Sequence, residues 1–153
     1  MIPPIEKIRK RKGLSVTYLP LGELLAACDI ISLHAAVTPQ TCGMVNAAFL
    51  SQMKNGSYLI NTARGELVDH LAVKEALFSG KLAGAGFDTL SPEPVPADHP
   101  LVRLPPEVED RVVFSPHLGG ITASSFCRAH RHMWSNVVRV FNGFQPDSIV
   151  NAL

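Results

Sequence analysis

Short apolar segments alternate with amphipathic ones along most of this chain. Runs rich in β-branched and aromatic residues, each bounded by turn residues, predict strands over residues 14–19, 29–34, 57–61, 82–88 and 111–115. Helical spacing of apolar positions predicts helices over residues 5–12, 22–28, 46–54 and 122–141, and one between Asp69 and Gly80. Strands that alternate with helices in this way predict βαβ units, and hence an α/β domain with a mainly parallel sheet.

The segment between the last two predicted strands is expected to be a long, mostly irregular loop. Residues 89–109 contain six prolines, and loops of this length in compact domains are usually functional. Ligands of parallel sheets bind beyond the carboxyl ends of the strands. The features directly after predicted strands are His34-Ala35, Thr62-Ala63-Arg64, Asp88 and His117. The pattern alone therefore predicts a ligand site at one edge of the sheet.

The composition is that of one folded domain. The chain has 153 residues, the size of a single domain. Hydrophobic residues make up 46% and charged residues 18%, a composition that argues against disorder. The net charge of +1 indicates neither a nucleic-acid nor a membrane partner, and the basic run 7–12 is interpreted as a solvated helix face. No apolar stretch approaches the roughly 18 residues that span a bilayer. Three cysteines without CxxC spacing argue against a disulfide framework, so a cytoplasmic location is expected.

Three side chains carry the candidate chemistry. Arg64 follows an apolar strand and suits a carboxylate, which its planar fork grips through two hydrogen bonds; the alternative is a structural ion pair. His117 precedes Leu118-Gly119-Gly120 and is a candidate proton donor near neutral pH, although a lone histidine is more often structural. Glu93 is either a solvated loop residue or the carboxylate that holds and charges this histidine.

A metal site is not expected. Cys127, His130 and His132 lie close together in sequence, but residues 130 and 132 point to different faces of the predicted helix. His99 is interpreted as a solvent-exposed loop residue. Trp134 and Phe141 are expected to pack against the protein rather than stack on a ligand.

Several segments, in order, resemble one known family. The motifs NTARGELVD (61–69), GAGFDTLSPEP (84–94) and SPHLGG (115–120) strongly resemble the NAD-binding domain of the D-2-hydroxyacid dehydrogenases, as does DIISLHAAVTPQT (29–41). The resemblance extends from Leu14 to the end of the chain. It implies a partial Rossmann-like, doubly wound fold. It also implies an oxidoreductase that transfers a hydride between NAD or NADP and C2 of a D-2-hydroxy acid or 2-oxo acid.

The resemblance assigns roles residue by residue. It implies that Arg64 binds the substrate carboxylate, that His117 is the acid/base, and that Glu93 is the partner of His117. Asp88 matches the residue that contacts the nicotinamide carboxamide. The positions that match the lining of the cofactor site are Ala35, Thr41, Thr62, Ala63, Arg64, Asp88, His117, Gly119 and Gly120.

The glycine turn of the family is not found in this sequence. Family members bind pyrophosphate with a G-x-G-x-x-G turn after their first strand, and none of the eleven glycines here takes that spacing. Compared with the family, residues 1–153 are expected to form a truncated dinucleotide-binding domain without the first βαβ unit and without the substrate domain. The choice between NAD and NADP, and the identity of the 2-hydroxy acid, therefore stay open. A non-catalytic remnant that serves as a binding or oligomerisation module is the alternative.

Three consequences are expected. Arg64, Glu93 and His117 should cluster in one crevice with Asp88 at its floor. The chain should expose an unusual apolar surface, or hide it in a homo-oligomer or against a complementing chain. On its own it should reduce 2-oxo acids negligibly, because half of the site that positions the reactants is missing.

Overall fold

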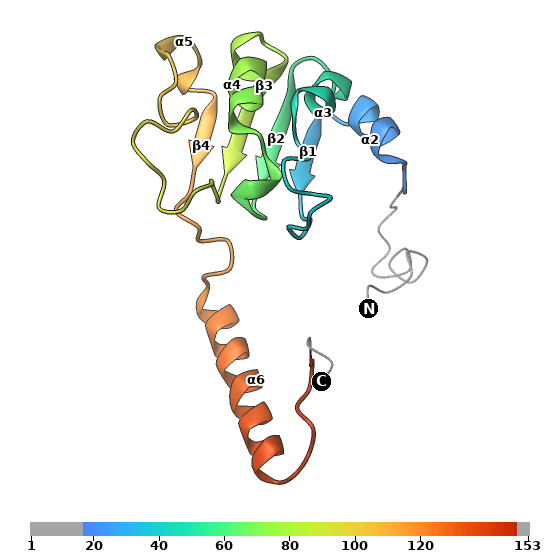
Figure 1. The fold of residues 1–153 in the computed structure, drawn as a ribbon, viewed down its shortest axis with the longest axis vertical. Coiled ribbons are helices and arrows are strands. Elements are labelled where there is room, and N and C mark those ends of the chain that lie inside the picture. Colours follow the sequence, from blue (N-terminus) through green and yellow to red (C-terminus); the bar gives the residue numbers. More distant parts are fainter. Residues whose placement is uncertain (1–16, 150–153) are drawn as a thin grey trace.

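The protein is described here by a computed structural model that covers residues 17–149 (Figure 1). Its centre is a four-stranded parallel sheet in the order β1-β2-β3-β4. The strands are β1 (Ile30–Leu33), β2 (Ser57–Asn61), β3 (Leu82–Phe87) and β4 (Val112–Phe114). The expected α/β class with a parallel sheet is confirmed. Because all strands run the same way, their carboxyl ends meet at one edge.

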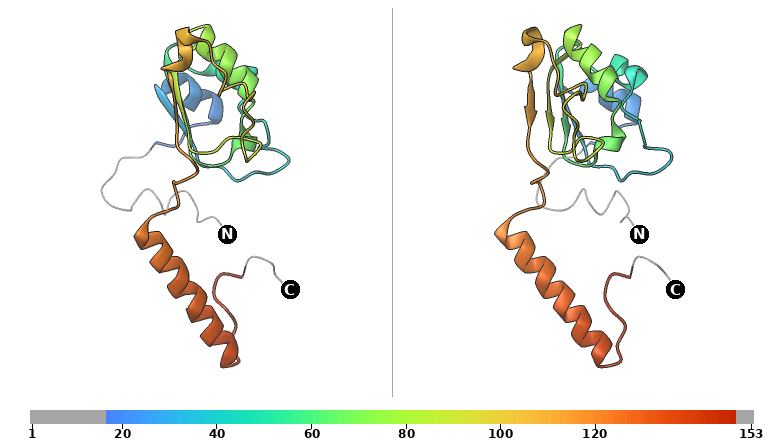
Figure 2. Two further views of the ribbon diagram at one scale, coloured as in Figure 1. Left: turned by 90° about the vertical axis from the view of Figure 1, so that its left-hand side faces the viewer. Right: turned by 60° about the vertical axis from the view of Figure 1, so that its left-hand side comes forward.

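Local capping explains where the connecting helices begin. The Asn46 side chain accepts a hydrogen bond from the backbone N–H of Phe49, and the Asp69 carboxylate accepts from those of Leu71 and Ala72. The helices are α2 (Leu21–Ala27), α3 (Ala47–Gln52), η1 (Gly65–Leu67), α4 (His70–Phe78), α5 (Pro106–Glu109) and α6 (Ala123–Phe141). Figure 2 shows α3 and α4 on the same side of the sheet.

The core lies between the sheet and this single layer of helices. Alternate side chains of a strand point to opposite faces, so Ile31, Leu33 and Leu59 are buried whereas Ile30 and Tyr58 are exposed. The apolar run 29–34 has the composition of a strand buried on both faces, but only one face of β1 is buried. The outward side chains have no covering layer within residues 17–149.

One predicted strand is not formed in its described part. Residues 17–19, the described part of the segment 14–19, are not in a strand, and Tyr18 and Leu19 are exposed. β-Branched and aromatic residues favour a strand only where a neighbouring strand offers backbone partners, and within the described residues β1 pairs with β2 alone. The rest of this segment and the helix predicted over residues 5–12 lie outside the described residues.

Helix α6 extends away from the sheet as an isolated rod (Figure 1). None of its 19 residues is buried. Trp134 and Phe141 were expected to pack against the protein, but they are 62% and 89% exposed. The chain then turns back along the helix, where the backbone N–H of Asp147 donates to the Asn136 side chain at 2.8 Å. No helix within residues 17–149 is both long and apolar enough to cross a membrane.

The 153-residue chain is expected to associate with itself in solution. The outer face of the sheet exposes Ile30, Tyr58 and Val113, and α6 exposes Trp134 and Phe141. Exposed apolar patches of this kind drive association or bind hydrophobic dyes. Sedimentation over a range of concentrations and the fluorescence of a hydrophobic dye are the measurements. A monomer at high concentration that binds no dye would contradict the expectation.

Candidate active site

The loops that follow the strands gather the candidate residues at one edge of the sheet. The turn Thr62-Ala63-Arg64 follows β2, Asp88 follows β3, and His117 lies three residues beyond the end of β4. The register aligns these ends, because Asn61 pairs with Phe87 and Phe87 pairs with Phe114. The parallel sheet therefore brings together residues that are more than 50 positions apart in the chain.

A buried asparagine builds the turn that presents Arg64. The amide nitrogen of Asn61 donates to the Arg64 carbonyl at 2.9 Å, and its amide oxygen accepts from the Ala63 N–H at 3.0 Å. The Arg64 guanidinium donates to the Ala63 carbonyl at 2.7 Å and is otherwise exposed. No carboxylate within residues 17–149 forms an ion pair with Arg64. The guanidinium thus keeps most of its donors for an external anion.

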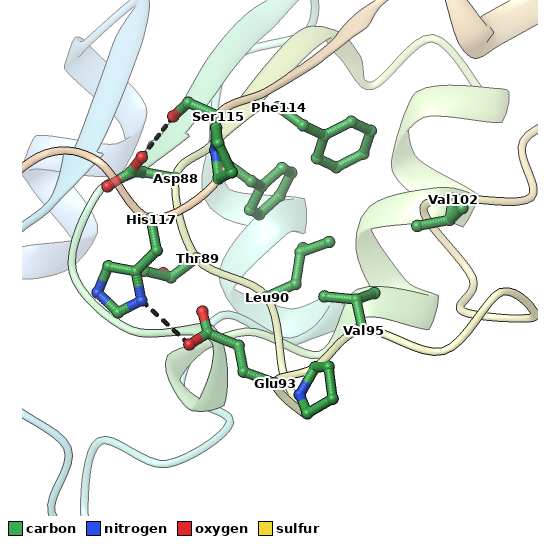
Figure 3. Close-up of a pocket in the computed structure, with 12 residues that line it drawn as sticks. Asp88, Thr89, Leu90, Glu93, Val95, Val102, Phe114, Ser115 and His117 are labelled. Carbon is green, nitrogen blue, oxygen red and sulfur yellow. Dashed lines mark hydrogen bonds and ion pairs between the residues drawn. The ribbon is translucent and has the colours of Figure 1, made fainter.

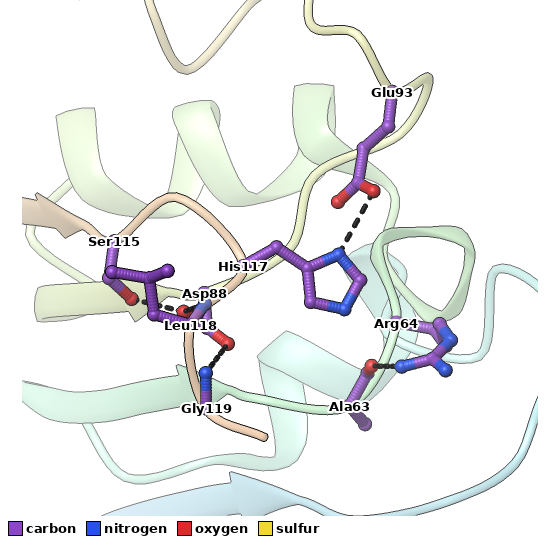
Figure 4. A network of polar contacts seen from close by, with 8 residues as sticks. All are labelled: Ala63, Arg64, Asp88, Glu93, Ser115, His117, Leu118 and Gly119. Carbon is purple, nitrogen blue, oxygen red and sulfur yellow. Dashed lines mark hydrogen bonds and ion pairs between the residues drawn. The ribbon is translucent and has the colours of Figure 1, made fainter. Parts of the chain in front are cut away.

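His117 and Glu93 form a direct pair (Figure 4). The His117 Nδ1 atom lies 3.0 Å from Glu93 Oε2, and both side chains are about half exposed. The other ring nitrogen, Nε2, makes no hydrogen bond within the described residues, and Figure 4 shows it facing the side of the crevice where Arg64 lies. This geometry leaves one imidazole nitrogen free to exchange a proton with a ligand while the other is held by a carboxylate.

The backbone at His117 adopts a conformation that side chains usually avoid. Its φ is +54°, in the left-handed region, which costs a non-glycine residue about 1–2 kcal/mol. The surrounding structure compensates, because the His117 N–H donates to the carbonyls of Asp88 and Ser115 at 2.9 and 3.0 Å. Strain of this kind concentrates at functional sites. Here it turns the imidazole toward Glu93.

Asp88 organises the turn that carries His117. Its carboxylate accepts hydrogen bonds from the Ser115 hydroxyl, the Leu118 N–H at 2.8 Å and the Gly119 N–H at 2.7 Å. The Ser115 hydrogen bond, supported by the two backbone N–H groups and by nearby His117, outweighs burial and lowers the pKa of Asp88. A Cβ on Gly119 would lie 2.8 Å from this carboxylate, so the close approach requires glycine. Sequence reasoning had missed Ser115, whose role depends on a contact 27 positions away.

The cavities around these residues form an extended concave surface. One of about 870 Å³ is lined by Thr62, Arg64, Asp88, His117 and the Gly119-Gly120 turn, and reaches Phe126 of α6. A second of about 550 Å³ includes Ala35, Thr62, Ala63 and Arg64. A third of about 390 Å³ includes Arg64, Glu93 and His117. Arg64 borders all three, which places the predicted cofactor residues other than Thr41, and the candidate trio, along one cleft.

Thr41 differs from the other predicted cofactor residues. Its hydroxyl donates to the Ala36 carbonyl at 2.7 Å, and its backbone N–H donates to the Thr38 carbonyl. These contacts show that Thr41 shapes the loop after β1. Ala35, in contrast, lines the cleft directly.

An apolar pocket lies beside the Glu93–His117 pair (Figure 3). Its volume is about 550 Å³, and its walls include Phe87, Leu90, Val95, Val102 and Phe114. In Figure 3, Leu90, Val95, Val102 and Phe114 lie to one side of the Glu93–His117 pair, which borders the pocket. The pair thus lies at the border between an apolar pocket and the cavity that Arg64 lines.

The comparison with protein families decides which family this is. Residues 3–119 match the NAD-binding domain of the D-isomer specific 2-hydroxyacid dehydrogenases. The chain belongs to this family. The family resemblance expected from the sequence is confirmed, and the description of the domain as NAD-binding confirms the expected class of cofactor.

Individual members of the family support the assignment. The glyoxylate reductase of Korarchaeum cryptofilum is 36% identical over 140 residues, which are 92% of this chain and 41% of that protein. A 2-hydroxyacid dehydrogenase of Lactobacillus delbrueckii, solved with NAD, superimposes with a TM-score of 0.76 at 34% identity over 88% of this chain and 43% of its own. Another from Xanthobacter autotrophicus, solved with NADPH, superimposes with a TM-score of 0.72 at 33% identity. The match covers 86% of this chain and 51% of that one. The chain therefore spans about two fifths to half of the length of these dehydrogenases.

Proposed function

We propose that this chain carries the proton-transfer and cofactor-facing half of an oxidoreductase that interconverts a 2-oxo acid and a D-2-hydroxy acid with NAD or NADP. One observation carries the proposal. His117, held by Glu93 at 3.0 Å, borders the same cavity as Arg64, a guanidinium without a carboxylate partner in residues 17–149. A proton donor beside an anion-binding cation is what the reduction of a 2-oxo acid requires. As proposed, residues 1–153 act as one dinucleotide-binding domain.

In this proposal Arg64 binds the substrate carboxylate. The planar guanidinium holds a carboxylate through two parallel hydrogen bonds, which fixes orientation as well as position. The contact between Arg64 Nη1 and the Ala63 carbonyl, at 2.7 Å, restricts the side chain before the substrate arrives. Asn61 restrains the turn from below. Preorganisation of this kind reduces the entropy that binding costs.

His117 exchanges the proton through Nε2. During reduction the imidazolium donates to the substrate oxygen as that oxygen gains negative charge, and in the reverse direction the neutral ring accepts the hydroxyl proton. Glu93 at Nδ1 orients the ring, so that Nε2 is the nitrogen available to the substrate. Such a positioned acid/base contributes about 10²–10⁴-fold to rate.

The cleft suits a nicotinamide dinucleotide. When bound, the nicotinamide ring supplies or accepts the hydride. Thr62, Ala63 and the Gly119-Gly120 turn border these cavities and would line the cofactor. No atom lies within 4 Å of the place that a Cβ of residue 120 would take, which leaves room for the cofactor there. Ala35 and Thr41 would lie toward the more distant part of the cofactor, and Asp88 toward the nicotinamide end. Three of the lone pairs of Asp88 already hold the His117 turn, so Asp88 serves the cofactor chiefly by shaping this turn.

Expressed by itself, the 153-residue chain is expected to reduce glyoxylate, hydroxypyruvate or pyruvate negligibly. Holding cofactor and carbonyl in reacting geometry is worth about 7–11 kcal/mol, and these residues contain no G-x-G-x-x-G turn for the pyrophosphate. NADH oxidation at high protein concentration is the measurement, with His117→Ala as the control. Turnover of about one per second that disappears in the variant would contradict this expectation.

A chimeric enzyme tests the proposed reaction itself. In the Korarchaeum cryptofilum glyoxylate reductase, the segment that aligns with this chain is replaced by the 140 aligned residues of this chain. We expect the chimera to oxidise NADH or NADPH in the presence of a 2-oxo acid. A chimera that folds and binds NADH but reduces none of the three 2-oxo acids named above would refute the proposal.

A further inference from the structure

Two histidines outside the candidate active site form a buried pair. His70 is the first residue of α4, and His99 lies in the proline-rich loop of residues 89–109. The two residues are only 9% and 4% exposed. His99 Nε2 lies 3.2 Å from His70 Nδ1, with the rings edge to face at 4.6 Å between centroids. The sequence interpretation of His99 as a solvent-exposed residue is therefore wrong, because the loop folds its ring inward against α4.

The hydrogen bonds determine where the ring protons lie. The backbone N–H of Leu101 donates to His99 Nδ1 at 3.2 Å, so Nδ1 carries no proton. The single proton of a neutral His99 is then on Nε2 and is donated to His70 Nδ1. His70 in turn carries its proton on Nε2, which is buried and has no partner within the described residues. A further proton on either ring would have to displace one of these two hydrogen bonds.

Burial keeps both rings neutral near neutral pH. Burial, reinforced by His99, lowers the pKa of His70 to about 4, although Asp69 opposes the shift. Burial also lowers the pKa of His99, against the opposing effects of the Ser91 carbonyl and Asp98. The aromatic neighbour Phe87, from β3, brings no charge to the pair. A proton taken up by the pair as the pH falls therefore enters a buried site whose two hydrogen bonds suit the neutral rings.

The pair lies between the two segments that carry the proposed reacting residues. His70 follows the turn of Arg64 by six positions, and His99 follows Glu93 by six. The same loop also contacts the turn of Arg64. There the backbone of Leu90 and Ser91 packs so closely on Gly65 that no side chain would fit at position 65. The Ser91 carbonyl also reaches the His99 ring. The histidine pair is thus a polar contact that joins α4 to the loop that carries Glu93.

We propose that His99, through its contact with His70, is a positioning residue that holds the Glu93 loop against the active site, and that protonation of His99 releases this loop. A proton on His99 Nδ1 turns the acceptor of Leu101 into a donor and places a positive charge in a buried site, which the Ser91 carbonyl and Asp98 offset only in part. The loop then opens and Glu93 leaves His117. This inference rests on the proposed function in one respect, the catalytic role given to the Glu93–His117 contact.

Hydrogen exchange of the whole chain tests this without any assay of turnover, so its failure is distinguishable from failure of the proposed reaction. The hydrogen-bonded amides of this loop, those of His99, Leu101, Val102 and Arg103, are compared at about pH 7.5 and about pH 5, a range in which histidines titrate, after correction for intrinsic exchange. In the wild type we expect protection to be several-fold lower at the lower pH, because the added proton displaces one of the two hydrogen bonds of the pair. His99→Gln keeps a donor toward His70 without taking up a proton, and should lose this pH response.

Two further variants complete the test. His99→Leu removes both hydrogen bonds and should lower protection at both pH values. His130→Gln, on the exposed surface of α6, is the matched control and should behave as the wild type. Because Glu93 and His117 are unchanged in His99→Gln, their own titration cannot produce a difference from the wild type. A pH response in His99→Gln equal to that of the wild type, or wild-type protection that is the same at both pH values, would overturn the proposal. If His99→Leu fails to fold, His99→Gln still decides the question.

Discussion

Replacing His117 with asparagine in the chimeric enzyme is expected to lower kcat by about 10²–10⁴-fold, the contribution of a positioned acid/base. The reason is that asparagine cannot exchange the proton that Nε2 carries. Asparagine suits the test better than alanine, because it tolerates the left-handed backbone conformation found here, with φ of +54°. The substitution thus removes the proton donor while keeping the fold of the turn.

Steady-state kinetics with NADH and glyoxylate measure the effect. His132→Asn, the same change at an exposed position of α6, is the control and should leave kcat within a factor of about two, as expected of surface substitutions. Binding of NADH to His117→Asn should be retained, because the backbone around Gly119 and Gly120 is preserved. A variant that binds NADH and turns over as fast as the unsubstituted chimera would exclude His117 as the acid/base.

Replacing Gly65 with alanine is expected to destabilise the fold by about 3 kcal/mol, the upper end of ordinary overpacking. A Cβ at this position would overlap the backbone of Leu90 and Ser91. A flexible side chain can rotate away from such a contact, but backbone atoms move only together with their segment. The substitution therefore pushes the proline-rich loop, and Glu93 with it, away from the Arg64 turn.

Denaturant unfolding of the 153-residue chain measures the loss of stability. Gly120→Ala is the matched control: no atom lies within 4 Å of the added methyl group, and the backbone there is not left-handed. The control should change the free energy of unfolding by less than about 0.5 kcal/mol. Equal stabilities of the two variants would show that the loop yields to the methyl group without cost, and that its packing on Gly65 is loose.

Local chemistry in the sequence was sufficient for most of the elements. Asn46, Asp69 and Thr122 cap helices because their side chains accept hydrogen bonds from backbone N–H groups two or three positions away. Gly80 follows the end of α4 and Gly56 forms the turn before β2, and both adopt the positive φ that glycine tolerates. Such interactions lie within a few residues, so they are readable along the chain. The βαβ order then predicted that the carboxyl ends of all strands lie at one edge of the sheet.

Part of the candidate site was also predictable. The order of Arg64, Glu93 and His117 within three motifs indicated their family, and the structure places Glu93 and His117 in contact and Arg64 on the same cavity. Their individual roles in catalysis stay proposals. Asn61 and Ser115 lie within these motifs, but the roles of their side chains were not inferred from the sequence. The Asn61 side chain builds the Arg64 turn through partners two and three positions away, whereas the Ser115 hydroxyl reaches Asp88, 27 positions away, which no local pattern specifies.

The sequence by itself determined the elements, their parallel order and the edge at which the candidate residues meet, because capping, turn chemistry and hydrophobic periodicity act over a few positions. Only the tertiary structure decided which faces are covered. Trp134 has the character of a core residue but lies on a helix with no buried residue, whereas His99 has the character of a surface residue but is buried against His70. Burial depends on which segments meet in space, and those partners are 29 positions apart for the two histidines. A periodicity along the chain carries no information on such contacts.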